Sequence, residues 1–238
     1  MPALIKPMPA LKPSLAERTA LAGLTGPLQA LIETPQIEAG GMQVVTAFAV
    51  VCHPHPLYGG TMDNKVVYTL ARTLEQLGAP AIRFNFRGVG SSAGRYDEGR
   101  GETDDALAAI AYGRQRWPGA QPWLAGFSFG GAVALRAAAQ GRPQRLITVA
   151  PGISIVPVTD VEAPACPWLI VQGDADEVVP PEAVRSFAQR LSPAPELKML
   201  AGAGHFFHGR LNELRDVVLA FMREAEQAPL IAQPPRAT

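Results

Sequence analysis

Two pentapeptides in this sequence follow the pattern Gly-x-Ser-x-Gly, Gly90–Gly94 and Gly126–Gly130. The pattern can place a serine hydroxyl on a sharp turn between a strand and a helix, where it can attack a carbonyl carbon. Such a nucleophile needs a general base, most often a histidine that is oriented by a carboxylate. The chain has four histidines, and several carboxylates follow an apolar segment. These residue types together indicate acyl-transfer chemistry through a covalent intermediate.

The segments around the two serines favour Ser128 as the nucleophile. The apolar segment PWLAGF leads into Ser128, and GGAVALRAAA, which is small and apolar on nearly every side, follows it at once. They are typical of a buried strand and a buried helix, the two elements that a nucleophile elbow joins. Ser92 also follows an apolar segment, but no helix is expected before about Glu102. We therefore interpret Ser92 as a loop serine. A dinucleotide-binding turn at Gly88–Ala93 is not predicted either, because it would need a helix N-terminus there.

The base is selected by chain order, which in this architecture is serine, acid, histidine. His53 and His55 precede Ser128 and are therefore excluded as the base. His205 follows the predicted strand ELKML, where a loop can hold an imidazole over the carboxyl edge of a sheet. His208 begins the next helix, where a surface or capping role is more usual. We expect His205 to be the base, with His208 as the alternative.

Three carboxylates compete for the place of the acid, and all follow the apolar segment WLIVQ: Asp174, Asp176 and Glu177. The acid must be buried against the imidazole, on the turn that carries the chain over the edge of the sheet. This requirement favours Asp176. Asp174 comes first after the strand and is expected to brace the loop, and Glu177 is the least favoured of the three.

A tetrahedral oxyanion needs backbone N–H donors. One is expected from Phe129, the residue after the nucleophile, and a second from the segment CHPHPLYGG. Proline lacks this donor, which leaves His55, Leu57 and Tyr58, and we favour His55. A metal site at His53 and His55 is not predicted, because the sequence offers no third ligand nearby.

Short apolar segments alternate with segments of helical period, which is typical of a parallel sheet covered by helices. AFAVVC and WLIVQ are apolar on both faces, as strands buried on both sides must be. Apolar residues recur at helical spacing in Val66–Leu77, Leu107–Ala111, Val184–Leu191 and Leu211–Met222. The predicted strands are Pro27–Glu33, Thr46–Cys52, Ala81–Phe86, Pro122–Phe127, Leu146–Ala150, Trp168–Gln172 and Glu196–Leu200.

The composition is that of a chain with a substantial core and no charge preference for a partner. Of the 238 residues, 47% are apolar, which argues against a disordered chain. Lysine plus arginine and aspartate plus glutamate are equal, at 21 each. Bulk charge therefore does not direct the chain to nucleic acid or to an acidic membrane surface. Because the residues described above indicate acyl-transfer chemistry, we expect the binding partner to be a small-molecule acyl substrate.

Both ends of the sequence are rich in proline. Four prolines interrupt the first fifteen residues, which excludes a secretory signal there. No apolar run approaches the roughly 18–20 residues that a membrane span needs, and the two cysteines are expected to be reduced thiols. We expect a cytoplasmic protein with flexible segments at 1–17 and 229–238. Because no linker interrupts the middle of the chain, 18–228 is expected to be one domain.

At these residues the sequence resembles the α/β-hydrolase superfamily, and within it the small bacterial serine hydrolases related to dienelactone hydrolases. The matching segments span residues 52–209 in the family's order; they are CHPHPLYGGTMDNKVV, RFNFRGVGSSAG, LAGFSFGG, QGDADEVVP and GAGHFFHG. The resemblance implies a mostly parallel, doubly wound sheet with helices on both faces. It also implies that Ser128 is the nucleophile, Asp176 the acid and His205 the base, with no metal or organic cofactor.

The sequence departs from its relatives in two places. Dienelactone hydrolases have a cysteine nucleophile, so Ser128 means that a dienelactone substrate does not follow from the resemblance. Typical members of the superfamily have His-Gly-X in the oxyanion loop, and Pro54 takes the place of that glycine here.

The proline-rich segment Pro151–Pro167 is too short to build the helical cap that many hydrolases of this fold carry. An open site suits small acyl substrates better than long lipids, and Leu57, Tyr58 and Phe206 are expected to form an apolar wall. The sequence therefore predicts a serine hydrolase that cleaves small carboxylic esters through an acyl-enzyme. The alternatives are an acyl-thioester or peptide hydrolase with the same residues, or a non-catalytic ligand-binding protein on this fold.

Overall fold

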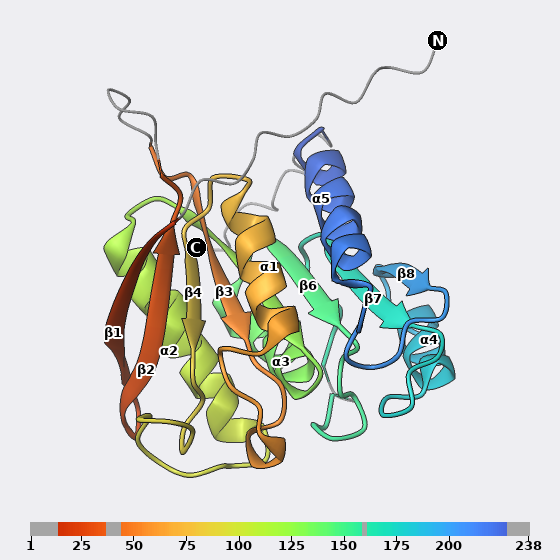
Figure 1. Ribbon diagram of the computed structural model, residues 1–238, viewed down its shortest axis with the longest axis horizontal. Helices are drawn as coiled ribbons and strands as arrows, with labels where there is room; N and C mark the ends of the chain where they lie inside the picture. The colour runs from red at the N-terminus through yellow and green to blue at the C-terminus, as the bar shows by residue number, and fades with distance from the viewer. Residues whose placement is uncertain (1–13, 37–43, 159–160, 228–238) are drawn as a thin grey trace, which may run out of the picture.

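A twisted sheet runs through the middle of the protein (Figure 1). The computed structural model describes residues 14–36, 44–158 and 161–227, and eight strands lie within them. They are β1 (Leu15–Gly23), β2 (Gly26–Thr34), β3 (Ala47–Cys52), β4 (Ala81–Phe84), β5 (Gln121–Phe127), β6 (Arg145–Val149), β7 (Trp168–Gly173) and β8 (Glu196–Leu200). Their order in the sheet is β1-β2-β4-β3-β5-β6-β7-β8. β2 pairs antiparallel with β1 and with β4, and all the other pairs are parallel.

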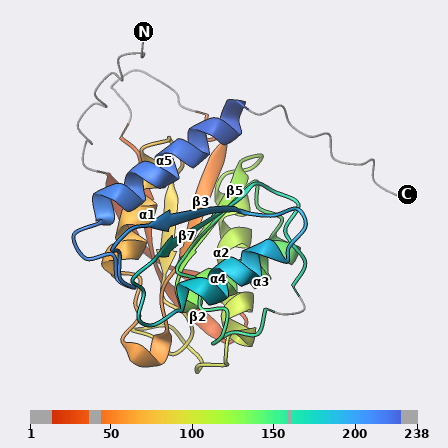
Figure 2. The same ribbon diagram turned by 90° about the vertical axis from the view of Figure 1, so that its right-hand side faces the viewer.

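Helices cover both faces of this sheet (Figure 2). They are the short 3₁₀ helix η1 (Pro56–Tyr58), α1 (Lys65–Glu75), α2 (Arg100–Arg116), α3 (Phe129–Gly141), α4 (Pro181–Gln189) and α5 (Leu211–Gln227). Buried residues of α2, α3 and α4 belong to one hydrophobic cluster, and those of α1 and α5 belong to a second cluster. In the described part of the chain, no helix is long and apolar enough to cross a membrane.

The central strands are apolar throughout because each face of the sheet meets one of the two clusters. Along β3 every residue is buried. Phe48 and Val50 lie in the cluster of α2, α3 and α4, whereas Ala49 and Val51 lie in the cluster of α1 and α5. This is the alternation that a strand imposes on successive side chains.

The seven strands predicted from the sequence are all present as β2 to β8, with ends that differ by at most a few residues. The α/β fold class is therefore confirmed, and so is the absence of a helical cap. Between β6 and β7, the described residues 150–158 and 161–167 contain neither helix nor strand.

β1 was not predicted, and the expected domain start at residue 18 was wrong, because this strand begins at Leu15. β1 is an edge strand in which Leu21 is the one residue that is buried. Its pairing with β2 holds it in place, and its own sequence shows little apolar alternation. Residues 1–13 of the expected N-terminal segment and the expected tail at 229–238 lie outside the described residues.

A buried ion pair fixes the loop that follows β4. The backbone N–H of Arg87 donates to Asp105 Oδ2 at 2.9 Å, and Nη2 of Arg87 donates to Asp105 Oδ1 at 2.8 Å. Both side chains are buried. A Cβ on Gly101 would lie 1.8 Å from Arg87 Nη1, so the guanidinium packs directly on the first turn of α2. Arg87 precedes the loop of residues 88–99, and Asp105 lies on α2, which follows this loop. The pair therefore holds the two ends of the loop together.

Replacing Asp105 by alanine should lower the free energy of unfolding by about 3–5 kcal/mol, because it leaves the buried Arg87 charge without its partner. Urea denaturation would measure the loss. Glu17→Ala is the control, since Glu17 forms a half-exposed pair with Arg116 at 3.5 Å and should cost less than about 1 kcal/mol. Equal losses in the two variants would contradict a structural role for the buried pair.

Candidate active site

Ser128 lies on a strained turn between β5 and α3. Its backbone has φ 56° and ψ −120°, a conformation that non-glycine residues rarely adopt. Two hydrogen bonds to the end of β6 and to the loop after it hold Ser128 there: Ser128 N–H donates to Val149 O at 2.9 Å, and Gly152 N–H donates to Ser128 O at 2.8 Å. Strain of this kind persists only where the surroundings enforce it, and it is frequent at functional sites.

The two glycines of the pattern permit this turn by letting three backbones approach closely. A Cβ on Gly126 would lie 2.1 Å from Gly130 O, and a Cβ on Gly130 would lie 2.4 Å from the carbonyl oxygens of Cys52 and His53. No side chain fits at those distances. The first glycine therefore lets α3 begin directly over β5, and the second lets α3 pack against the end of β3.

The turn brings Ser128 together with the two residues that the sequence assigned to base and acid. Ser128 Oγ is 3.0 Å from His205 Nε2, and His205 Nδ1 is 2.9 Å from Asp176 Oδ2. The three residues follow β5, β8 and β7, whose carboxyl ends meet at one edge of the sheet because these strands are parallel. All three are buried.

The carboxylate of Asp176 accepts four hydrogen bonds. Oδ1 accepts from the backbone N–H groups of Val178 and Val179, both at 2.8 Å, and Oδ2 accepts from His205 Nδ1 and from Gln172 Nε2. Burial by itself raises the pKa of Asp176, but the bonds from His205, Val179 and Val178 together outweigh it and hold the pKa below its ordinary value. Asp176 is therefore ionised at neutral pH, and it keeps the proton of His205 on Nδ1.

The other residues that the sequence offered as acid, base or nucleophile have different contacts. Asp174 accepts a hydrogen bond from Gly202 N–H at 2.6 Å and so braces the loop after β8, as expected. Glu177 accepts from the backbone N–H of His205 at 3.4 Å. His208 is exposed. Ser92 has a buried hydroxyl that accepts from Gln29 N–H at 2.9 Å and donates to Asn85 O at 2.7 Å, which leaves it no part in the site.

Hydrogen bonds in the loop after β3 leave His55 as the candidate for the second oxyanion donor. Leu57 N–H donates to His55 Nδ1 at 3.2 Å, and Tyr58 N–H donates to His55 O at 3.1 Å, so both donors are engaged. Within the described residues, the N–H groups of His55 and Phe129 have no acceptor. The rings of His55 and Phe129 lie 4.9 Å apart, which places the two residues side by side.

His53 stabilises the loop after β3 through two hydrogen bonds of its ring. Its buried ring donates from Nδ1 to Pro54 O at 2.6 Å and accepts the N–H of Phe86 on Nε2 at 3.0 Å. Burial lowers the pKa of His53 to about 4, and the bond to Pro54 opposes this only in part. The ring is therefore neutral at pH 7. Among the described residues, no three side chains of the metal-binding types form a cluster.

The chain is similar in sequence and in fold to known α/β serine hydrolases. A family model for the alpha/beta hydrolase fold matches residues 51–165. An α/β serine hydrolase without a lid from Xanthomonas campestris is 42% identical, with a TM-score of 0.83, and the alignment covers 94% of this chain and 99% of that one. The chain belongs to the α/β-hydrolase family. Another structure of an α/β serine hydrolase homologue of this family, from Coxiella burnetii, is 45% identical, with a TM-score of 0.80, over 86% of this chain and 96% of that one.

The family also includes a close relative without an assigned role. An uncharacterised protein of Rickettsia prowazekii is 38% identical over 181 residues, which are 71% of this chain and 76% of that protein. The similarity to the Xanthomonas hydrolase places this chain in the small, lidless group of the α/β-hydrolase family.

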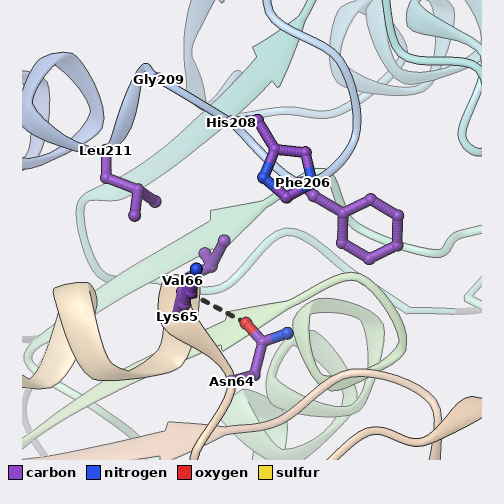
Figure 3. A pocket seen from close by; sticks show the side chains of 7 residues that line it. All are labelled: Asn64, Lys65, Val66, Phe206, His208, Gly209 and Leu211. Carbon is purple, nitrogen blue, oxygen red and sulfur yellow. Dashed lines mark hydrogen bonds between the residues drawn. The ribbon is translucent and has the colours of Figure 1, made fainter.

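Two hollows flank the site. One, of about 170 Å³, lies between the start of α1 and the loop that leads into α5 (Figure 3), and Phe206 in its lining contacts the ring of His205. It is lined by Asn64, Lys65, Val66, Phe206, His208, Gly209 and Leu211. The other, of about 430 Å³, lies beyond Phe129 and is lined by Tyr96, Glu98, Arg100, Arg136, Ile155 and Pro157. Of the expected apolar wall, Leu57 is 66% exposed, Tyr58 85% and Phe206 44%.

Two residues of the site escaped the sequence analysis. Gln172 is fully buried and donates to Asp176 Oδ2 at 2.9 Å, and Tyr96 shares a hydrogen bond of 3.2 Å with His55 Nε2. A polar residue that ends the apolar strand WLIVQ was a usable signal for Gln172. Nothing local marked Tyr96, because it reaches His55 from a loop 41 residues further along the chain.

Stability should fall as the pH is lowered from about 6.5 to about 4. In the unfolded chain His53 binds a proton below its ordinary pKa of 6.5, whereas in the folded protein it does so only near 4. The difference amounts to about 3 kcal/mol at most. Urea denaturation at several pH values would measure it.

His53→Gln is the matched variant, because its amide can still donate and accept but cannot titrate. Its stability at pH 7 is expected to be lower, and its decrease between pH 6.5 and 4 smaller than that of the wild type. An identical pH dependence in the two proteins would rule out His53 as the source.

Proposed function

We propose that this protein hydrolyses small carboxylic esters through an acyl-enzyme on Ser128. The observation that carries the proposal is the continuous chain of hydrogen bonds from Ser128 through His205 to Asp176. With the proton of His205 held on Nδ1 by the carboxylate, Nε2 has a free lone pair for the hydroxyl proton of Ser128. The unusual φ of Ser128 supports catalysis over simple binding, because a binding pocket has no need of a strained serine.

In the first half-reaction, Ser128 Oγ attacks the ester carbonyl carbon while its proton passes to His205 Nε2. The tetrahedral oxyanion accepts hydrogen bonds from the N–H groups of Phe129 and His55, which have no acceptor among the described residues. Asp176 stabilises the imidazolium that forms. His205 then gives its proton to the leaving alcohol as the C–O bond breaks, and Ser128 is acylated.

In the second half-reaction, a water molecule loses a proton to His205 Nε2 and attacks the acyl carbon. Collapse of the second oxyanion releases the carboxylic acid, and the proton on His205 returns to Ser128 Oγ. The steps use no metal or organic cofactor. Residues 150–158 and 161–167 form no helical cap. We therefore expect water to reach the acyl-enzyme directly.

We place the reaction in the cytoplasm. Cys52 and Cys166 are both unpaired thiols, and a reducing compartment would keep them so.

Burial raises the pKa of Cys166 to about 11, which makes its thiol a poor nucleophile at neutral pH.

A fluorophosphonate probe tests whether Ser128 is the nucleophile. The wild type should be labelled, and Ser128→Ala should not, because the probe forms a covalent bond only with an activated serine. Ser92→Ala is the matched control and should still be labelled, since its hydroxyl is engaged by Gln29 and Asn85. Labelling that persists in Ser128→Ala but disappears in Ser92→Ala would reverse the assignment.

The acid is tested by paired substitutions in one loop. Asp176→Asn should lower kcat for a 4-nitrophenyl ester by about 10⁴-fold, because an amide no longer holds the proton of His205 on Nδ1. Asp174→Asn, which only braces Gly202, should keep kcat within about tenfold of the wild type. A mild effect of Asp176→Asn beside an inactive Asp174→Asn would overturn the proposal for the acid.

A further inference from the structure

The larger hollow lies directly beside the proposed oxyanion site. The ring of Tyr96, which lines it, is 5.8 Å from the ring of Phe129. A Cβ on Gly152 would lie 3.2 Å from Phe129 N and 3.4 Å from Ile155 Cδ1, so Ile155 lines the hollow next to the same amide. A group that extends from the carbonyl carbon on Ser128 can therefore enter this space, whose volume of about 430 Å³ suits a small acyl chain.

The two hollows differ in their relation to His205. The leaving alcohol takes its proton from His205 Nε2, so it must lie on the side of His205. That side has the smaller hollow with Phe206 and His208 (Figure 3). The larger hollow, on the side of Phe129 and Tyr96, is left for the acyl part of the ester.

Tyr96, which lines the larger hollow, also shares a hydrogen bond with His55. His55 Nδ1 accepts from Leu57 N–H, which places the ring proton on Nε2, and Nε2–H then donates to Tyr96 Oη at 3.2 Å. The hydroxyl hydrogen of Tyr96 is left to donate to another acceptor. Burial raises the pKa of Tyr96, so the hydroxyl keeps its hydrogen at neutral pH.

Arg136 adds a positive charge to the larger hollow. Its Nη1 donates to Pro157 O at 2.6 Å, and its buried Nε has no partner. No carboxylate among the described residues pairs with it, whereas the other two charges of the hollow, Glu98 and Arg100, pair with each other at 3.2 Å. Arg100 also pairs with Asp97. An unmatched guanidinium is the group best suited to bind a carboxylate.

The separation of the two ends of the hollow sets the length of the acyl group. Arg136 lies seven residues after Phe129 on α3, which is about 10 Å along the helix axis. Long side chains on a helix tend to lean toward the N-terminus of that helix, and in α3 this is the end next to Ser128. A carboxylate several methylene groups away from the ester carbonyl would reach the guanidinium.

We propose that the larger hollow binds a carboxylate at the far end of the acyl group, held by Arg136, while Tyr96, which lies beside His55, lines the nearer part of the hollow. The substrate class is then a monoester of a dicarboxylic acid with a medium-length chain. This inference rests on the proposed ester hydrolysis at Ser128 and narrows its substrate.

The test compares two series of 4-nitrophenyl esters of adipic, pimelic and suberic acid. In one series the distal carboxylate is free, and in the other it is capped as a methyl ester of equal length. Shorter diacids are left out because their carboxylate attacks its own ester. The wild type should prefer the free acid in at least one pair by about 10–100-fold in kcat/KM, mainly through a lower KM.

Variants of Arg136 connect that preference to the guanidinium. In Arg136→Met the ratio of kcat/KM for the free acid to kcat/KM for the capped ester should fall below about threefold. Arg136→Lys should retain part of the preference for the free acid, because an ammonium keeps the charge but not the planar fork of the guanidinium. Arg116→Met is the control, since Arg116 is exposed and pairs with Glu17 outside the hollow. It should keep the ratio of the wild type.

The outcomes separate this inference from the proposed function. Hydrolysis of capped esters with no preference for free acids, or a preference that survives in Arg136→Met, overturns the carboxylate site and leaves ester hydrolysis standing. If neither series is hydrolysed and the fluorophosphonate does not react, the proposed function itself fails. Should Arg136→Met not fold, the ratio in the wild type and in Arg136→Lys still decides the question.

Discussion

The active site depends on the close approach of three backbones at Gly126 and Gly130. There the end of β5, the start of α3 and the end of β3 are so near to one another that a single Cβ at either glycine would overlap with a carbonyl oxygen. Ser128 lies within this contact at a positive φ, and its hydroxyl is within hydrogen-bond distance of His205. The contact also brings the segment that contains His55 next to Phe129. One steric condition thereby positions the proposed nucleophile and both proposed oxyanion donors.

Buried charges are stabilised in different ways in the candidate active site and in the core beneath the loop after β4. Arg87 and Asp105 neutralise each other fully in the core and hold the loop after β4 in place. Asp176 has no cationic partner as long as His205 is neutral, and backbone N–H groups and Gln172 stabilise its charge instead. The site therefore holds a carboxylate that is ready to stabilise an imidazolium, should one form during the proposed reaction. Arg136 is the reverse case, a cation for which the described residues supply no carboxylate partner.

A parallel sheet explains why these groups meet. The carboxyl ends of β3, β4, β5, β6, β7 and β8 lie along one edge, and the loops that follow them supply the proposed triad, the proposed oxyanion donors and most of the residues around the hollows. The proposed leaving-group side is the side of His205, which would donate the proton, and the proposed acyl side is the side of the Phe129 and His55 amides.

The sequence by itself predicted seven of the eight described strands, the helices that cover them, and Ser128, Asp176 and His205 as the candidate site residues. Apolar runs, helical spacing and the order of motifs are local or sequential signals, and they survive without knowledge of the fold. β1 was missed because its stability comes from pairing with β2. Only the tertiary structure decided that Leu57 and Tyr58 have engaged N–H groups, and that Gln172, Tyr96 and Arg136 surround the site. These facts rest on contacts between segments that lie far apart in the chain, and short-range patterns do not encode such contacts.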